Sequence, residues 1–378
     1  MRRRIYIFVF LLMLGEALLF SVNSPFIVKL VGEDLVGTLY SLSSLGAILL
    51  LALLPIFIRR SSPAKILTTL ILVAAAAALL VGYGNSLWTI GALVIFLVIP
   101  QVAPAVSDIF IEKSSRVAER GSVVGTELTF MNLAFVIAPI IAGWIIVSHG
   151  FNVLYTISGV IFLLALFASL TFIAKNKPSH THPGNLWRGI ASAWTRKDLR
   201  YVLITQFLLQ LFFSWMIIYT PLYLIDKFGF GFETLGIIFS IMLLPYILLE
   251  YPLGKIADNK LGEKELLSCG FVLMAITVGV IPFITSGAAW VWVVILFGTR
   301  VGAAMVEGMS AIYFFKKVEA KDIDLLALFR DMRPLAYLIG PIVASVIIAD
   351  GSMISLFPTL SILMILGALT ATRLHDTK

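Results

Sequence analysis

Residues 66–83 read ILTTLILVAAAAALLVGY, a run of eighteen residues that contains no charged side chain. As an α-helix this run is about 27 Å long, close to the roughly 30 Å of hydrocarbon in a bilayer. A strand of a membrane barrel would instead alternate apolar and polar residues over roughly ten positions. The run is apolar on nearly every side, so it predicts a helix that crosses a membrane.

Similar apolar blocks follow one another along the whole chain. Hydrophobic residues make up 60% of the 378 residues and charged residues only 13%, whereas soluble domains average about 25% charged residues. We therefore predict an all-α integral membrane protein with twelve transmembrane helices. The predicted spans are residues 5–24, 36–58, 66–83, 88–107, 122–147, 152–174, 201–225, 234–254, 265–286, 288–315, 324–348 and 354–372.

The basic residues are distributed unevenly between the two sides of the membrane. Of the 28 Lys and Arg residues, 23 lie at the termini or in loops on the same side as the amino terminus. Lys29 and Lys227 lie on the opposite side, and Arg300, Arg330 and Arg333 fall within spans. Because cytoplasmic loops are enriched in Lys and Arg, both termini of this multi-pass protein are predicted to lie on the cytoplasmic side of the cell membrane. The net charge of +7 then reflects orientation in the membrane, and we expect no nucleic-acid partner.

One long polar connection, residues 175–200, divides the predicted helices into six and six. It predicts an N-terminal bundle at residues 1–174, a cytoplasmic linker, and a C-terminal bundle at residues 201–378. Residues 185–196 place apolar and aromatic side chains at helical spacing, which is typical of a short helix at the membrane interface. His180 and His182 have no thiol or carboxylate partner nearby, so we interpret them as polar spacer and predict neither a metal nor a cofactor.

The two halves of the chain repeat each other. Glycine, polar and charged matches at one constant offset carry this inference, because apolar matches mean little in such a composition. A shift of 199 residues pairs Gly32 with Gly231, Asp34 with Glu233, Gly37 with Gly236, Ser41 with Ser240, Lys65 with Lys264, Gln101 with Arg300, and Asp108 with Glu307. Parallel repeats of this kind are related by an axis along the membrane normal and hold a binding cavity between them.

The connection after the eighth span reads GKIADNKLGEK at residues 254–264. Its residues Gly254, Asp258, Lys260, Gly262 and Lys264 resemble the cytoplasmic loop motif of the major facilitator superfamily. The pattern suits a tight turn between two helices, because glycine adopts backbone conformations that other residues avoid and the acidic residue can face a helix amino terminus. The alternative is an ordinary charged turn. The resemblance implies a transporter fold of two pseudo-symmetric six-helix bundles.

Other segments match the superfamily only in part. The corresponding first-half loop, PIFIRRSSP at residues 55–63, has Arg59 and Pro63 where the motif has Asp and Gly, so its role in gating stays open. GTRVGAA at residues 298–304 resembles the Arg-Gly helix motif of the family, and APIIAG at residues 138–143 is similar to a motif of its exporting members.

Polar side chains inside apolar spans are the candidates for a transport site, since such residues usually face a bundle interior or a water-filled cavity. In the superfamily the first, fourth, seventh and tenth spans line the central cavity, and each of them carries a polar side chain here. The candidates for proton coupling and the cavity are Glu16, Gln101, Glu127, Asn132, Gln206, Gln210 and Arg300.

Glu16 lies at mid-depth in the first span and is the candidate for a proton-carrying carboxylate. A carboxylate removed from water takes up a proton more readily, so it can change charge as it is exposed to each side in turn. The alternative is a structural role, in which a cation such as Arg300 holds Glu16 permanently.

Asp108 and Glu307 lie near the predicted cytoplasmic ends of the fourth and tenth spans. They resemble the charge network that surrounds the loop motif in the superfamily. The resemblance implies a cytoplasmic gate in which Asp258, Lys264 and Glu307 form a latch that breaks when this side opens.

The leading hypothesis for function is a secondary active transporter that exchanges a small molecule for protons by alternating access. The chain has no Gly-x-x-x-x-Gly-Lys-Ser/Thr loop, so it is not expected to hydrolyse ATP. Acidic residues outnumber the one Arg in the candidate cavity, which favours cationic or neutral amphipathic compounds, and the partial exporter motif favours efflux of such drug-like compounds. Proton-coupled uptake of a sugar or another nutrient is the alternative.

Two further classes of protein are less consistent with the sequence. A membrane-embedded enzyme would need clustered Asp, Glu or His for acid–base or metal chemistry. The closest cluster, Glu319 with Asp322 and Asp324, contains no His, so we do not predict an enzyme. A receptor or scaffold on the same fold is the other alternative, because a fold does not determine a function. We expect a monomer.

Overall fold

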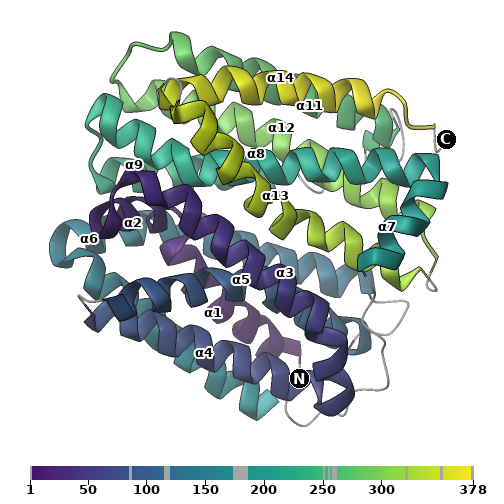
Figure 1. The fold of residues 1–378 in the computed structure, drawn as a ribbon, viewed down its shortest axis with the longest axis horizontal. Helices are drawn as coiled ribbons and strands as arrows, with labels where there is room; N and C mark the ends of the chain where they lie inside the picture. Colours follow the sequence, from purple (N-terminus) through teal and green to yellow (C-terminus); the bar gives the residue numbers. More distant parts are fainter. Residues whose placement is uncertain are drawn as a thin grey trace. The chain divides into compact units, whose positions relative to one another are not determined.

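The structure is a computed structural model that describes residues 2–84, 87–114, 120–172, 186–249, 252–253, 256–257, 262–319, 322–349 and 352–375. Within these residues all regular structure is helical (Figure 1), which confirms the predicted all-α class. The chain divides into two compact units. The first unit comprises Met1–Pro183 with Gly231–Ile237, and the second unit comprises Gly184–Phe230 with Ile238–Lys378.

The helices follow the predicted apolar blocks closely. The first unit contains α1 (Arg2–Phe20), α2 (Asn23–Val31), α3 (Val36–Arg60), α4 (Pro63–Tyr83), α5 (Leu87–Ser114) and α6 (Arg120–Phe172). The second unit contains α7 (Leu186–Thr195), α8 (Lys197–Phe228), most of α9 (Phe232–Leu248), α11 (Glu263–Val280), α12 (Ala289–Lys317), α13 (Ile323–Ala349) and α14 (Leu356–Ala371). Short 3-10 turns lie at Glu33–Leu35, Ile281–Phe283 and Met353–Ser355.

Local sequence signals explain where helices begin and end. At the start of α4, the Ser62 hydroxyl accepts a hydrogen bond from the backbone N–H of Lys65 at 3.3 Å, and Pro63 occupies the first helical position. Proline suits this position because its missing N–H would have no partner inside the helix. At the end of α8, Gly229 takes the left-handed conformation at φ 66°, which glycine adopts without a steric penalty.

The first predicted span, residues 5–24, is not one straight helix. It is broken between α1 and α2, which meet at a bend of 48°, and α2 continues to Val31. The break has an identifiable cause. Pro25 has no N–H to donate within the helix. The neighbouring Asn23 accepts a hydrogen bond from the Tyr155 hydroxyl at 2.7 Å, and Ser24 lies 3.2 Å from the Tyr40 hydroxyl.

The fifth and sixth predicted spans lie in the single long helix α6. They are separated at Gly150, whose φ of 83° and ψ of 175° are not helical. Among the described residues, nine helices are long and apolar enough to cross a membrane, or ten when the bent pair α1 and α2 counts as one span. Because α6 contains two spans and α9 is a shorter apolar helix, these numbers are consistent with the twelve predicted spans.

Small residues bring helices into close contact inside each unit. A methyl group placed on Gly302 of α12 would lie 2.7 Å from the carbonyl oxygen of Gly270 on α11, which is closer than any real contact. In the first unit, a methyl group on Gly15 of α1 would lie 3.0 Å from the ring of Phe162 on α6. Small residues at helix crossings are typical of membrane proteins, because backbone packing replaces the hydrophobic effect as the source of association.

Candidate functional site

Glu16 lies half-buried on α1, on a segment that is tightly packed against the second half of α6. The hydroxyl of Ser158 donates a hydrogen bond of 2.7 Å to the carbonyl oxygen of Gly15, and the following residues Ala17 and Leu18 are buried. The backbone on both sides of Glu16 is therefore held in place by packing and by a hydrogen bond.

Two further candidates lie in the first unit. Gln101 on α5 donates from Nε2 to the carbonyl oxygen of Leu97 at 3.0 Å, while its Oε1 is buried and has no hydrogen-bond partner among the described residues. Asn132 is half-buried on α6. The side chain of Glu127 lies outside the described part of the structure.

A buried polar network at the bend of the first span was not predicted. It joins Asn23 to Tyr155 and Ser24 to Tyr40, and all four side chains are buried. The only signal in the sequence was the run SVNSP at residues 21–25, whose residue types favour turns and caps over a helix interior. The network connects α2 to α3 and α6 and so stabilises the bend, which follows Glu16 by a few residues in the sequence.

In the second unit, Arg300 is buried in the middle of α12 at 1% exposure. Its guanidinium carbon lies over two rings of α8, at 5.4 Å from the centroid of Phe212 and 5.5 Å from that of Phe213. A buried ion costs several kcal/mol even after relaxation, and a desolvated cation–π contact contributes up to about 2 kcal/mol. The two rings therefore offset only part of the cost of burying this charge.

Gln206 and Gln210 are both 7% exposed on α8, so both side chains are buried, and their place in a transport cavity stays a prediction. Their spacing of four residues places them on one side of the helix. The Oε1 atom of Gln206 has no hydrogen-bond partner within the described residues. A buried carbonyl oxygen without a hydrogen-bond partner costs roughly 1–3 kcal/mol. Gln206 at this position therefore lowers the stability of the fold.

The predicted gate is described only in part. Gly254, Asp258 and Lys260, and the side chain of Asp108, lie outside the described residues, so the proposed latch stays a prediction. Gly262 lies immediately before α11 and has a φ of 69°. Glycine adopts this conformation readily, as the turn of the motif requires.

The remaining gate residues occupy different environments. Lys264 follows in the first turn of α11 and is half-buried. Glu307 is exposed, whereas Arg300, seven residues earlier on the same helix, is buried. The spacing of seven residues places Glu307 and Arg300 on the same side of α12, but only Arg300 is buried.

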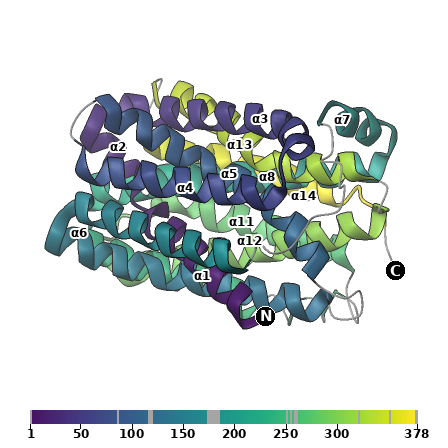
Figure 2. The ribbon, with the colours of Figure 1, turned by 90° about the horizontal axis from the view of Figure 1, so that it is seen from below.

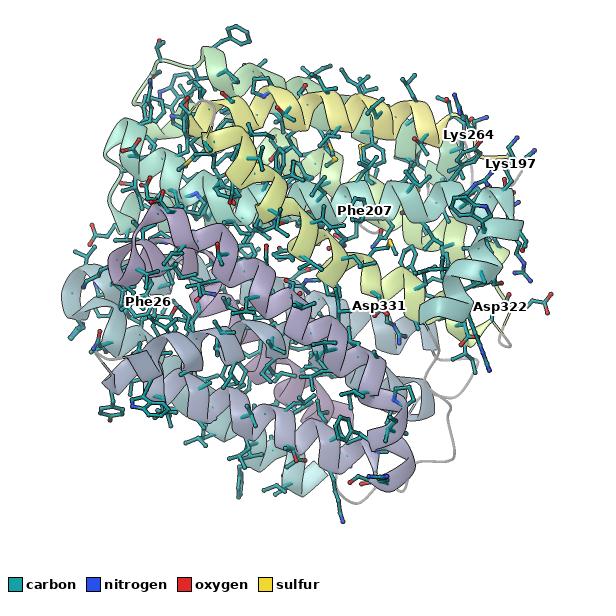
Figure 3. All side chains as sticks on the ribbon, viewed as in Figure 1. Phe26, Lys197, Phe207, Lys264, Asp322 and Asp331 are labelled. Carbon is teal, nitrogen blue, oxygen red and sulfur yellow. The ribbon has the colours of Figure 1, made fainter. Side chains whose placement is uncertain are left out.

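Ion pairs at one end of the second unit were missed by the sequence analysis. Lys197, Lys264 and Asp322 lie at this end (Figure 3), as does α7 (Figure 2). Glu263 is 1% exposed and is paired with Lys316 of α12. Asp198 accepts from the Lys317 ammonium at 2.9 Å and lies 2.6 Å from Nδ1 of His375.

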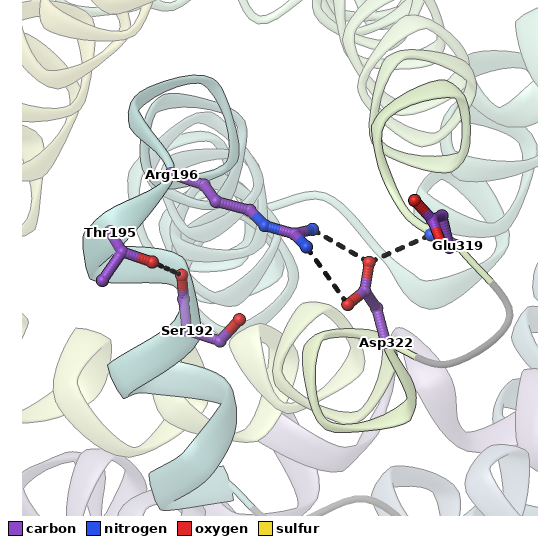
Figure 4. Close-up of polar contacts among 5 residues, drawn as sticks. All are labelled: Ser192, Thr195, Arg196, Glu319 and Asp322. Carbon is purple, nitrogen blue, oxygen red and sulfur yellow. Dashed lines mark hydrogen bonds and ion pairs between the residues drawn. The ribbon is translucent and has the colours of Figure 1, made fainter.

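The short helix α7, predicted at residues 185–196, is observed at Leu186–Thr195 and is anchored to α13. The guanidinium of Arg196 reaches both oxygens of Asp322, at 2.9 and 3.4 Å, and the backbone N–H of Glu319 donates to the same carboxylate at 3.0 Å (Figure 4). A methyl group on Gly189 would lie 2.4 Å from the carbonyl oxygen of Asp324. Close packing and an ion pair therefore both hold α7 on the second unit.

Comparison with known proteins identifies the fold. The family model described as Major Facilitator Superfamily matches residues 5–321, with a second match over residues 203–377. The fold is similar to that of a crystallised mutant of the nucleoside transporter NupG, with a TM-score of 0.75 over 99% of each chain at 14% sequence identity. A sequence search against curated proteins finds no match.

Proposed function

Because the chain belongs to the major facilitator superfamily, we propose that it is a secondary active transporter that moves a small solute across the cell membrane by alternating access. The family match and the fold both indicate a multi-pass membrane transporter and not an enzyme. The observation that carries the proposal is the buried polar set of Arg300, Gln206 and Gln210 inside apolar helices. Polar and charged groups inside a membrane bundle cost free energy, so they usually mark a functional site.

Proton coupling is proposed at Glu16. The packing of α1 against α6 around Gly15 supports this role, because it places a half-buried carboxylate on a closely packed helix of the first unit, and a carboxylate that is partly removed from water takes up a proton more readily. Gln101 and Asn132 lie half-buried on other helices of the same unit and can take part in binding the solute.

We propose export as the direction of transport, with drug-like or amphipathic compounds as the solutes. The partial exporter motif at residues 138–143 supports this choice. Uptake of a polar nutrient is the second candidate, favoured by the amides of Gln206 and Gln210, which are typical groups for binding hydroxyls and amines.

The end of the second unit that carries Gly262, Lys264 and α7 is proposed to be the cytoplasmic end. The positive-inside distribution of Lys and Arg supports this orientation. The loop motif with Asp258, Lys264, Asp108 and Glu307 then lies on the cytoplasmic side, where it would close the passage in the outward-open state. We propose that the protein works as a monomer.

A flux experiment tests the proposal. The purified protein is reconstituted into proteoliposomes, which are loaded in turn with amphipathic cations, amphipathic anions and neutral sugars. Flux of each solute is measured with and without an imposed proton gradient. At least one class should move faster with the gradient, and the Glu16→Gln variant should lose this stimulation while the Glu233→Gln variant, altered at an exposed position, retains it.

Flux without any dependence on the gradient, or an unchanged Glu16→Gln variant, would remove Glu16 from the coupling role. Absence of flux for every class, together with specific ligand binding, would favour a receptor on a transporter fold.

A further inference from the structure

The guanidinium of Arg300 has one edge without a partner. Its Nε and Nη2 atoms are buried and have no hydrogen-bond partner among the described residues. These two nitrogens lie side by side on the long edge of the group, and their N–H bonds point in nearly parallel directions. Two parallel N–H donors form the fork that binds both oxygens of a carboxylate.

The same guanidinium already has two aromatic neighbours. The rings of Phe212 and Phe213 lie 5.4 and 5.5 Å from the guanidinium carbon, so a third aromatic or apolar group is not what the site lacks. Phe212 is fully buried, whereas Phe213 is partly exposed. Of the two rings beside Arg300, Phe213 is therefore the one on which an aromatic part of a ligand can rest.

A second unpartnered atom lies along the same side of α8. Gln206, whose Oε1 has no partner within the described residues, stands seven positions before Phe213. Seven positions are two helical turns, or roughly 10 Å. A solute that binds Arg300 through an acidic group can thus present a hydroxyl or amine to Gln206 when it is long enough.

We propose that the second unit binds the carboxylate of an aromatic acid, with both oxygens on Nε and Nη2 of Arg300 and the aromatic ring on Phe213. The inference rests on the proposed transport function in one respect: the acid that binds to Arg300 is taken to be the transported solute. It narrows the solute from amphipathic compounds in general to amphipathic anions, in contrast to the cations that a count of acidic residues favours.

The experiment measures equilibrium binding, so that it is independent of transport. The full-length protein in detergent is titrated with 2-naphthoate, with 2-naphthamide of the same shape, and with the cation 2-naphthylmethylammonium, and the melting temperature is followed. We expect 2-naphthoate to raise the melting temperature in a saturable way, with a Kd at least tenfold lower than that of the amide, and the cation to have no effect.

Two variants at the site and one control complete the test. Arg300→Lys keeps the charge but removes the fork, and it should weaken binding of 2-naphthoate at least tenfold. The matched control, Arg333→Gln, removes another arginine of the second unit, which lies 6.0 Å from the Tyr337 ring, and should leave binding unchanged.

Phe213→Leu serves if the Arg300 variant does not fold. It should weaken binding of 2-naphthoate but not of cyclohexanecarboxylate, which has no aromatic ring.

Equal stabilisation by the acid, the amide and the cation would overturn the proposal. So would an Arg300→Lys variant that melts at a lower temperature but binds 2-naphthoate as the native protein does, since Arg300 would then be structural. Saturable binding of the acid in a protein that transports nothing would leave this inference standing and refute only the transport function.

Discussion

Removal of the Lys316 side chain should destabilise the second unit more than removal of its neighbour Lys317. Glu263, the partner of Lys316, is 1% exposed, whereas Asp198, the partner of Lys317, is 20% exposed and also lies 2.6 Å from Nδ1 of His375. Loss of one partner of a fully buried ion pair costs about 3–5 kcal/mol, because the other charge stays buried.

The expected magnitude is smaller than this limit. Lys316 itself is 45% exposed, so water reaches Glu263 once the lysine side chain is gone, and we expect about 1–3 kcal/mol for Lys316→Ala. For Lys317→Ala we expect less than about 1 kcal/mol, as for other ion pairs in contact with water. A loss of 1 kcal/mol lowers the melting temperature by about 2 °C in a chain of this length. The melting temperature should therefore fall by roughly 2–6 °C for Lys316→Ala and by less than about 2 °C for Lys317→Ala.

Thermal unfolding of the full-length protein in one detergent and at one pH provides the measurement. The double variant Glu263→Gln with Lys316→Ala should recover most of the loss, because no buried charge then lacks its partner. The reasoning is refuted if Lys317→Ala is as harmful as Lys316→Ala, or if the double variant is no more stable than Lys316→Ala alone.

Three other substitutions test the packing described above. Gly302→Val should destabilise the protein by about 1–3 kcal/mol or more through a collision with the backbone of α11, whereas Gly308→Ala, where the added methyl group meets no atom within 4 Å, should be tolerated; melting curves distinguish the two. Tyr155→Phe removes the donor to buried Asn23 and should cost about 1–3 kcal/mol, and an unchanged melting temperature would show that the bend does not depend on this bond. Gly189→Leu should release α7 from α13, so that limited proteolysis cuts within residues 186–195 faster than in the native protein.

The class of fold could be predicted from the sequence because the bilayer imposes a simple requirement on each segment separately. A run such as residues 66–83 must be apolar over the thickness of the hydrocarbon, whichever helices surround it. The same holds for Gly262, whose positive φ follows from the local turn. The bend after Phe20 escaped prediction, because Ser, Asn and Pro are all tolerated in membrane helices. The residue that binds the Asn23 side chain at the bend, Tyr155, is 132 positions away in the chain.

For the candidate site, the sequence by itself determined which polar residues stand inside apolar spans, among them Glu16, Gln206 and Arg300. Only the tertiary structure decided what surrounds them, such as the two rings over Arg300 and the unpartnered edge of its guanidinium. The physical reason is the range of the interactions. Passage through a membrane depends on the composition of one segment, whereas burial, pairing and ring contacts depend on side chains from helices that are distant in sequence and meet only in the folded bundle.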